Sequence, residues 1–369
     1  MRLDASIAAL RAWGEPSYRE EQLRHAVTRY LIADWSEATT LSKALRARLA
    51  EKVPFAQLTL DREERASDGT VKAVFRTLDG FPLEAVLMVH GSRRTVCLSS
   101  QSGCALACTF CATGTMGLGR NLDRGEILEQ LLWAARIARA DEARIGNVVM
   151  MGMGEPFMNY DEVLAFCRDA NDPDGFGLGA RSIAISTAGW IPGIDRLADE
   201  PMQIKLALSL HAPTDELRTR LMPVTKRYPL EELMEACRRY RLATRRRIFI
   251  EYLLLDHVND GPADARELAR LLGRGDRGAF HVNLIVYNPT SAQYRAAAVD
   301  RVRAFQGTLE QAGVDASLRR SHGQDIEAAC GQLAVRGARE RRLELARERH
   351  ASPAAAVGSG DLPLGSYLS

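Results

Sequence analysis

The stretch Thr95-Val-Cys-Leu-Ser-Ser-Gln-Ser-Gly-Cys-Ala-Leu-Ala-Cys-Thr-Phe-Cys111 decides how the rest of the chain is interpreted. A strand-like run, TVCLSS, leads into Cys104, Cys108 and Cys111, a C-x3-C-x2-C arrangement. Three thiolates this close can bind three irons of a cubane cluster and leave the fourth iron open to an external ligand. A structural zinc site usually needs a fourth Cys or His, and none follows closely, while Cys97 lies inside the predicted strand. We therefore predict an iron–sulfur cluster, with zinc as the alternative.

Downstream of this stretch, apolar runs alternate with helical patterns. The runs are TVCLSS, NVVMMGM, SIAISTAG, IKLALSLH, RIFIEYLLLD and FHVNLIVYNP, and segments such as RGEILEQLLWAARIARA lie between them. Continuous apolar strands separated by helices indicate a parallel sheet covered by helices. The predicted fold class is α/β, a partial (β/α)6 barrel over residues 95–336. Its active residues should gather at the C-terminal ends of the strands.

The regions on either side of the barrel have different patterns. Residues 1–70 read as short amphipathic helices, which predicts a small N-terminal accessory domain. Residues 71–94 predict a connecting hairpin, VKAVFRTL and FPLEAVLMV, joined by Asp79-Gly80, a dipeptide favoured in tight turns. Residues 337–369 predict a charged helix followed by a disordered tail.

The composition is that of an ordinary globular protein. Of its 369 residues, 46% are hydrophobic and 26% charged, and the net charge is only +2, which neither demands nor excludes a nucleic-acid partner. No apolar run is long enough to span a bilayer and the N-terminus is charged, so we expect a cytoplasmic protein without a membrane partner. The 7 cysteines, an odd number in a long chain, favour metal or thiol chemistry over a disulfide framework.

Polar and small residues stand where several predicted strands end. They are Gly154, Glu155, Ser186, Ser209, Leu210, His211 and Asn288. Glycine lets the backbone approach a ligand closely, and Glu155 supplies a carboxylate beside Gly154. Each residue alone is more often an ordinary strand-end residue. Their shared position makes them candidates for one binding site.

Several motifs together resemble the RlmN/Cfr family of radical S-adenosylmethionine RNA methyltransferases. They are CLSSQSGCALACTFCATGTMGLGRNL, MMGMGEPFMNY, ISTAGWIPGI, LALSLHAPTDELRTRLMPV, IEYLLLDHVND, VNLIVYNP and DIEAACGQL. The resemblance covers nearly the whole chain and extends to the N-terminal EPSYREEQL, which is similar to a helical domain that helps to engage RNA. It implies a [4Fe-4S] cluster on the three cysteines and S-adenosylmethionine, used twice per turnover, bound at the strand ends.

The resemblance also assigns roles to residues that are unremarkable by themselves. One S-adenosylmethionine methylates the cysteine that corresponds to Cys330, and a second is cleaved to a deoxyadenosyl radical that takes a hydrogen from the S-methyl group. The methylene radical then adds to an adenine ring carbon, which offers no nucleophile for polar methyl transfer. Cys97 matches the thiol that resolves the protein–RNA adduct through a transient disulfide with Cys330. Glu84, in an otherwise apolar strand where an unused carboxylate would be costly, matches the general base.

The implied reaction is methylation of C2 of an adenine in 23S rRNA, with tRNA as a further candidate substrate. The adenine must leave its stack to reach a buried site. An electron donor such as flavodoxin or ferredoxin is implied, and we expect a monomer. The alternative is C8 methylation of the same adenine, the antibiotic-resistance activity of the Cfr branch. His322 stands where the RlmN branch more often has Arg, and HVNLIVYNPT and RLMPVTKRYP are more similar to the Cfr branch. Two others are a radical enzyme with a small-molecule or peptide substrate, and a zinc-holding RNA-binding protein.

Overall fold

The computed structural model describes residues 3–273, 278–290 and 293–333. Its main strands are β1 (Leu58–Arg65), β2 (Val71–Thr77), β3 (Pro82–His90), β4 (Arg93–Cys97), β7 (Ile145–Met150), β8 (Ile183–Thr187), β9 (Lys205–Ser209), β10 (Ile248–Leu254), β11 (Phe280–Val286) and β12 (Ala316–Arg319). In the described part they form one sheet in that order. The short strands β5 (Gln101–Gly103) and β6 (Leu118–Asn121) pair separately.

The second half of the sheet is the predicted partial barrel. In the order β4, β7, β8, β9, β10, β11 and β12, each strand pairs parallel with the next. The first six coincide with the apolar runs found in the sequence, which confirms the fold class, and β12 adds a short seventh. The runs are apolar throughout because central parallel strands are buried on both faces.

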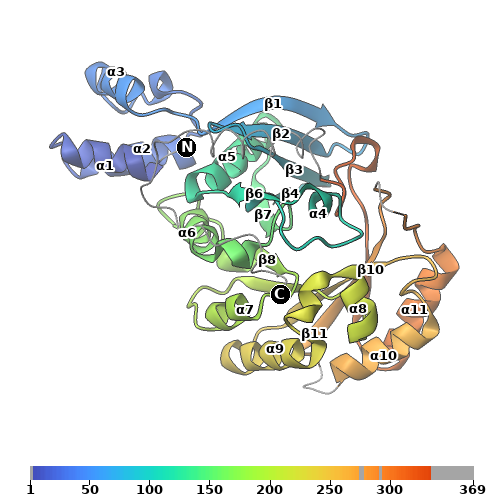
Figure 1. Ribbon diagram of the computed structural model, residues 1–369. Helices are drawn as coiled ribbons and strands as arrows, with labels where there is room; N and C mark the ends of the chain where they lie inside the picture. The colour runs from blue at the N-terminus through green and yellow to red at the C-terminus, as the bar shows by residue number, and fades with distance from the viewer. Residues whose placement is uncertain (1–2, 274–277, 291–292, 334–369) are drawn as a thin grey trace, which may run out of the picture.

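Helices form an outer layer along the barrel. The α-helices of the described chain are α1 (Leu3–Ala12), α2 (Tyr18–Thr28), α3 (Lys43–Lys52), α4 (Ala112–Met116), α5 (Arg124–Ala140), α6 (Tyr160–Asn171), α7 (Ile191–Ala198), α8 (Asp215–Leu221), α9 (Leu230–Thr244), α10 (Pro262–Gly273) and α11 (Val299–Gln311). Short 3-10 helices lie at Trp35–Glu37, Pro156–Asn159, Ala180–Ser182, Pro223–Lys226 and Gln324–Ile326. We call α5, α6, α7, α9, α10 and α11, which lie outside the curved sheet in Figure 1, the helical shell.

The N-terminal region departs from the sequence prediction. Helices α1 to α3 appear as predicted, but residues 58–65, placed in the helical domain, form strand β1, so that prediction was wrong. β1 is an edge strand in which only Leu58 is buried, and its charged side chains give no apolar alternation to recognise. The hairpin of β2 and β3 is also continuous with the barrel, because β3 pairs with β4. The charged helix and tail predicted for 337–369 lie outside the described residues.

Two arginines of the helical shell fasten the N-terminal helices to the barrel. Arg136 of α5 donates to the carbonyls of Leu31 (3.0 Å) and Ile32 (2.5 Å), and Arg139 donates to that of Tyr30 (2.6 Å). These carbonyls come just after α2, at the helix end where the peptide dipoles favour a positive charge. The N-terminal helices stand to one side of the sheet (Figure 1).

The buried side chains form two apolar clusters. The larger one runs through the N-terminal helices, the sheet and the helical shell. The smaller one lies around the cysteine loop and joins it to the chain after the later strands; its buried members are Leu106, Phe110, Ala188, Ala212, Leu221, Met222, Val224, Leu253, Leu255 and Tyr287. In the described chain, no helix is both long and apolar enough to cross a membrane.

Candidate active site at the strand ends

The three motif cysteines lie on a tight loop between β5 and α4, which we call the cysteine loop (residues 104–111). Gly103 begins it with φ +79°, and a Cβ there would lie 1.9 Å from the carbonyl oxygen of Gly117. That oxygen accepts the N–H of Cys104 (3.1 Å), and the N–H of Cys111 donates to the carbonyl of Cys108 (3.1 Å). The loop therefore closes on itself only because residue 103 lacks a side chain.

The donor set fits an iron–sulfur cluster. Burial, together with the neighbouring thiols, raises the pKa of Cys104 to about 12 and that of Cys108 well above its ordinary value. Three thiolates can therefore share this loop at neutral pH only with a strongly cationic partner. No group of three His, Cys, Asp or Glu among the described residues is arranged to hold one metal ion. A cubane cluster does not need three ligands around one metal ion, because each thiolate bonds a different iron.

The loop after β7 is held close to the cysteine loop. Gly154 has φ +98°, and a Cβ on it would lie 2.5 Å from the Cβ of Gln101. The Gln101 side chain accepts the N–H of Glu155 (2.8 Å), whose carboxylate in turn accepts the N–H groups of Ala188 (2.7 Å) and Phe157 (3.1 Å). Burial nevertheless raises the pKa of Glu155 to about 7. This carboxylate thus ties the end of β7 to the end of β8.

The predicted residues of β8 and β9 lie side by side. The hydroxyls of Ser186 and Ser209 are 3.3 Å apart. Leu210 is fully buried, and the ring of His211 packs edge-on against Phe110 of the cysteine loop at 4.9 Å between centroids. Burial lowers the pKa of His211 to about 3, and its Nδ1 accepts the N–H of Leu253 (3.0 Å). The neutral ring therefore carries its proton on Nε2.

The segment that carries Cys330 packs against the cysteine loop. The N–H of Ala112 donates to the Gly331 carbonyl (2.8 Å), and the Thr113 hydroxyl donates to that of Leu333 (2.5 Å). The side-chain amide of Asn288, predicted at the end of the last strand, donates to the Cys330 carbonyl (3.4 Å). A methyl-carrying thiol on this segment would therefore be next to the cluster.

Cys97 and Cys330 belong to the same site. Cys97 is buried at the end of β4, and burial, with the charge of Cys330, raises its pKa. Solvent reaches the Cys330 side chain, but the surrounding protein still raises its pKa, first by desolvation and then through the charge of Glu251. Both thiols are thus protonated at rest and close enough to influence one another.

Glu84 comes from the antiparallel part of the sheet but reaches the same end. It is buried near the start of β3. Val86, two residues further along the same strand, pairs with Cys97. The buried amine of Lys72 lies 3.9 Å from the Glu84 carboxylate and 3.4 Å from the carbonyl of Glu327, three residues before Cys330. Lys72 thereby links the proposed base to the Cys330 segment.

His322 lies at the start of the Cys330 segment. Its Nδ1 is 3.1 Å from a carboxylate oxygen of Asp68, which also accepts the N–H of Gly323 (3.1 Å). Asp325 accepts the N–H of Ser67 in the same turn (2.9 Å). We call these contacts the Asp68 clasp. They fasten the segment to the turn between β1 and β2.

Three buried charged residues at this end of the barrel were missed by the sequence analysis: Lys72, Glu251 and Arg218. Lys72 in VKAVF and Glu251 in IEYLLL are charged residues in apolar strands, a pattern that also supported the assignment of Glu84 by resemblance. Arg218 in DELRTRL has no such signal, since arginine in a short charged helix reads as a solvated face. The Cys104–Cys111 loop and the seven predicted strand-end residues, with Glu84, Cys97 and Cys330, make up the strand-end site.

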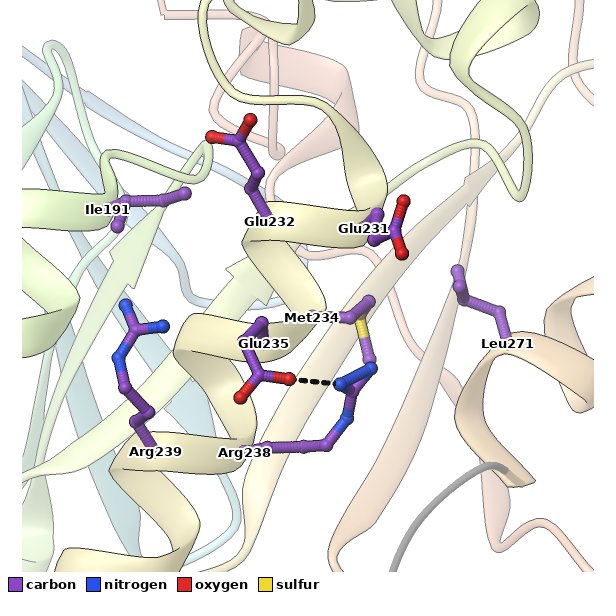
Figure 2. Close-up of a pocket in the computed structure, with 8 residues that line it drawn as sticks. All are labelled: Ile191, Glu231, Glu232, Met234, Glu235, Arg238, Arg239 and Leu271. Atoms are coloured by element: carbon purple, nitrogen blue, oxygen red, sulfur yellow. Dashed lines mark hydrogen bonds and ion pairs between the residues drawn. The ribbon is translucent and has the colours of Figure 1, made fainter.

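A separate groove lies between α7, α9 and α10, on the helical shell. Its volume is about 530 Å³, and it is lined by Ile191, Glu231, Glu232, Met234, Glu235, Arg238, Arg239 and Leu271. Figure 2 shows that Arg238 pairs with Glu235 on the surface of α9. None of the residues of the strand-end site lines this groove.

Comparisons with known proteins agree with this geometry. The model of the radical SAM superfamily matches residues 98–272. A probable dual-specificity RNA methyltransferase RlmN of Chloroflexus aurantiacus is 47% identical over 337 residues, or 89% of each chain. A protein of the same name from Symbiobacterium thermophilum is 44% identical over 92% of this chain and 91% of its own. The crystal structure of a radical SAM methyltransferase from Sphaerobacter thermophilus has a TM-score of 0.87 and 50% identity, and covers 90% of this chain and 97% of that one.

Proposed function

Since this chain belongs to the RlmN family of radical S-adenosylmethionine RNA methyltransferases, we propose that it adds a methyl group to C2 of an adenine in 23S rRNA. The enzyme uses a [4Fe-4S] cluster and S-adenosylmethionine, two molecules per turnover. We propose tRNA as a second substrate, supported by the dual specificity in the names of its relatives. Those names favour the C2 reaction over the C8 reaction of the Cfr branch.

One observation carries the proposal for the site: the backbone contact between the cysteine loop and the Cys330 segment. The Ala112–Gly331 hydrogen bond joins the residues that directly follow Cys111 and Cys330. A radical generated at the cluster must reach the methyl group before it is quenched, so the methyl carrier has to be adjacent. The contact supports cluster ligation by Cys104, Cys108 and Cys111, and methyl transfer from Cys330.

When bound, the cluster supplies the electron that cleaves S-adenosylmethionine. In our proposal Cys330 holds the methyl group as a thioether. After the carbon has been transferred, the Cys97 thiolate attacks the Cys330 sulfur, so that a Cys97–Cys330 disulfide replaces the carbon–sulfur bond, and the released carbon takes up a proton to become the methyl group of the RNA. Glu84 takes the proton from the adenine ring carbon, and Lys72 keeps the Glu84 carboxylate oriented toward the Cys330 segment.

The residues proposed to bind S-adenosylmethionine at the strand ends are Gly154, Glu155, Ser186, Ser209, Leu210, His211 and Asn288. Each oxygen of Glu155 accepts one backbone N–H group and keeps a further lone pair, so we assign the methionine amino group to this carboxylate and to the backbone beside Gly154. The Nε2–H of His211 is a donor for a polar group of the cofactor.

The remaining proposals concern partners and location. We propose that the N-terminal helices help to engage the RNA, that a flavodoxin or ferredoxin supplies electrons, and that the enzyme is a cytoplasmic monomer. The target adenine leaves its stack to reach the strand-end site, which favours a loop base in folded RNA.

The decisive experiment is nucleoside analysis of RNA methylated by the anaerobically purified protein, with RNA from a strain that lacks its own enzyme. We expect 2-methyladenosine in 23S rRNA, and a product with only 8-methyladenosine would contradict the proposal. The Cys330→Ala variant should bind the cluster but transfer no methyl group. Cys167→Ala, which removes a buried thiol of α6, is the matched control and should stay active. Methylation by Cys330→Ala would exclude Cys330 as the carrier.

A further inference from the structure

Arg218 of α8 is a buried cation surrounded by neutral acceptors. Its guanidinium donates to the carbonyls of Ala188 (2.6 Å), Ser209 (3.2 Å) and Leu210 (3.1 Å), and to the Thr225 hydroxyl (2.9 Å). The side chain has no exposed surface, and no carboxylate of the described residues lies within 4.0 Å of it. Burying a charge without a counter-charge is strongly unfavourable. An arrangement kept at that cost calls for a negative group nearby.

The groups of the chain itself do not provide that negative charge. Burial lowers the pKa of Arg218 to about 10, and only Cys108, Asp215 and Cys237 act in the opposite direction. Asp215 is negatively charged, but it lies more than 4.0 Å from the guanidinium and accepts the N–H of Leu230 (2.8 Å), so it does not pair with Arg218 directly. Cys237 is a fully buried thiol whose pKa is raised to about 12, so it is neutral. Cys108 remains, and it becomes a permanent thiolate only when it binds iron.

The backbone brings Arg218 up to the cysteine loop. The N–H of Thr109, the residue after Cys108, donates to the carbonyl of Leu221 (2.9 Å), which ends α8. The guanidinium also spans the ends of β8 and β9, because Ala188 follows the first strand and Leu210 the second. Arg218 therefore lies behind the strand-end site, on the side where Cys108 stands.

We propose that Arg218 is a positioning and charge-compensating residue of the cluster, which makes the cluster easier to reduce. The inference rests on the proposed ligation by Cys104, Cys108 and Cys111. A cluster with three thiolates is negatively charged, and reduction adds one more negative charge. A fixed cation in a low-dielectric surrounding stabilises the reduced form more than the oxidised form, which raises the reduction potential.

The test is the midpoint potential of the anaerobically reconstituted cluster, followed by electron paramagnetic resonance during a redox titration. Iron and sulfide are first measured to establish full loading. Arg218→Met, which removes the charge, should move the potential to a more negative value. Arg218→Lys, which keeps the charge, should stay near the wild type. Arg220→Met on the exposed face of α8 is the matched control and should leave the potential unchanged.

The results that differ from these expectations would reject either charge compensation by Arg218 or the proposed function. An unchanged potential in a fully loaded Arg218→Met protein rejects charge compensation. An equal negative shift in Arg218→Lys and Arg218→Met also rejects it, because the hydrogen bonds to the strand ends would then be the cause. If Arg218→Met does not fold, Arg218→Gln, whose amide still donates to the carbonyls, takes its place with the same criteria. Wild-type protein that loads no iron would reject the proposed function itself.

Discussion

Cys167 and Cys237 lie in the helical shell, on α6 and α9, whereas Cys104, Cys108 and Cys111 lie on the cysteine loop. The shell cysteines are completely buried on regular helices, where a thiol acts as a small apolar side chain. The loop cysteines are half-buried, on a backbone that is closed by glycines and short hydrogen-bonded turns. The same side chain therefore fills space in one region and is a proposed ligand in the other, and the backbone that carries it makes the difference.

Removing one cysteine from each region tests this comparison most strongly. Cys108→Ala should lose the cluster, because two thiolates cannot hold the cubane in place, and methyl transfer should be abolished. Cys167→Ala should keep its iron and its activity and lose roughly 1 kcal/mol of stability. Iron and sulfide content and thermal unfolding measure both variants. A full iron content in Cys108→Ala would contradict the proposed role of the loop cysteine as a ligand, and an absence of iron in Cys167→Ala would contradict the role of the shell cysteine as a space-filling side chain.

Glu84→Gln tests whether a carboxylate at the strand-end site is chemically active. The change keeps the shape but removes the base, so turnover should fall by about 10²- to 10⁴-fold. Methylation of Cys330 should persist, and the protein–RNA adduct should accumulate because its ring proton is not removed; mass spectrometry detects both. Glu64→Gln is the control, since Glu64 contacts the same Lys72 at 3.6 Å from the outer side. Equal effects of the two changes would mean that Lys72 pairing alone matters.

Glycine substitutions compare the backbone at the start of the cysteine loop with the backbone of an open turn outside it. Gly103→Ala places a Cβ 1.9 Å from the Gly117 carbonyl at a positive φ, so it should cost about 1–3 kcal/mol and lower the iron content. Gly179, at φ −60° before the 3-10 helix that precedes β8, has open space around it. Gly179→Ala should change stability by less than about 0.5 kcal/mol. Thermal unfolding measures both, and equal losses would remove the distinction.

The smallest effect concerns the Asp68 clasp. Partial burial opposes ionisation of Asp68, but hydrogen bonds from Thr70, Gly323 and His322 outweigh it and keep the pKa below its ordinary value. The clasp therefore contributes fully at neutral pH, and its contribution is lost as the pH falls below about 4. The carboxylate is partly exposed, so its share is at most about 1 kcal/mol. Asp68→Asn should speed proteolysis between residues 319 and 333 at pH 7 and leave little difference at pH 3.

The sequence predicted those parts of the fold whose burial leaves a local pattern. Strands β8, β9, β10 and β11 are mostly buried and β4 and β7 partly so, and all six therefore appear as apolar runs. Strands β1 and β12 lie at the two edges of the sheet, where exposed and charged side chains remove that pattern. The N-terminal helices were predicted correctly, but the end of their region was placed at residue 70, beyond β1, which belongs to the sheet.

The site divides in a similar way. Cys104, Cys108 and Cys111 are close in sequence, so their spacing alone predicted a cluster. Cys97 and Cys330 are far apart and looked ordinary, and only the family resemblance singled them out. Arg218 could not have been found, because its burial results from three carbonyls that strands β8 and β9 bring to it.

The hydrogen bonds that join the cysteine loop to the Cys330 segment also set an order of events during synthesis. Thr113 and its partner Leu333 are 220 residues apart in the chain. The cysteine loop therefore leaves the ribosome long before the segment that covers it. The N–H of Ala112 can bond the Gly331 carbonyl only when the barrel is nearly complete. The loop therefore reaches its folded form only after the last strands have been translated, and until then Thr113 has no contact with Leu333.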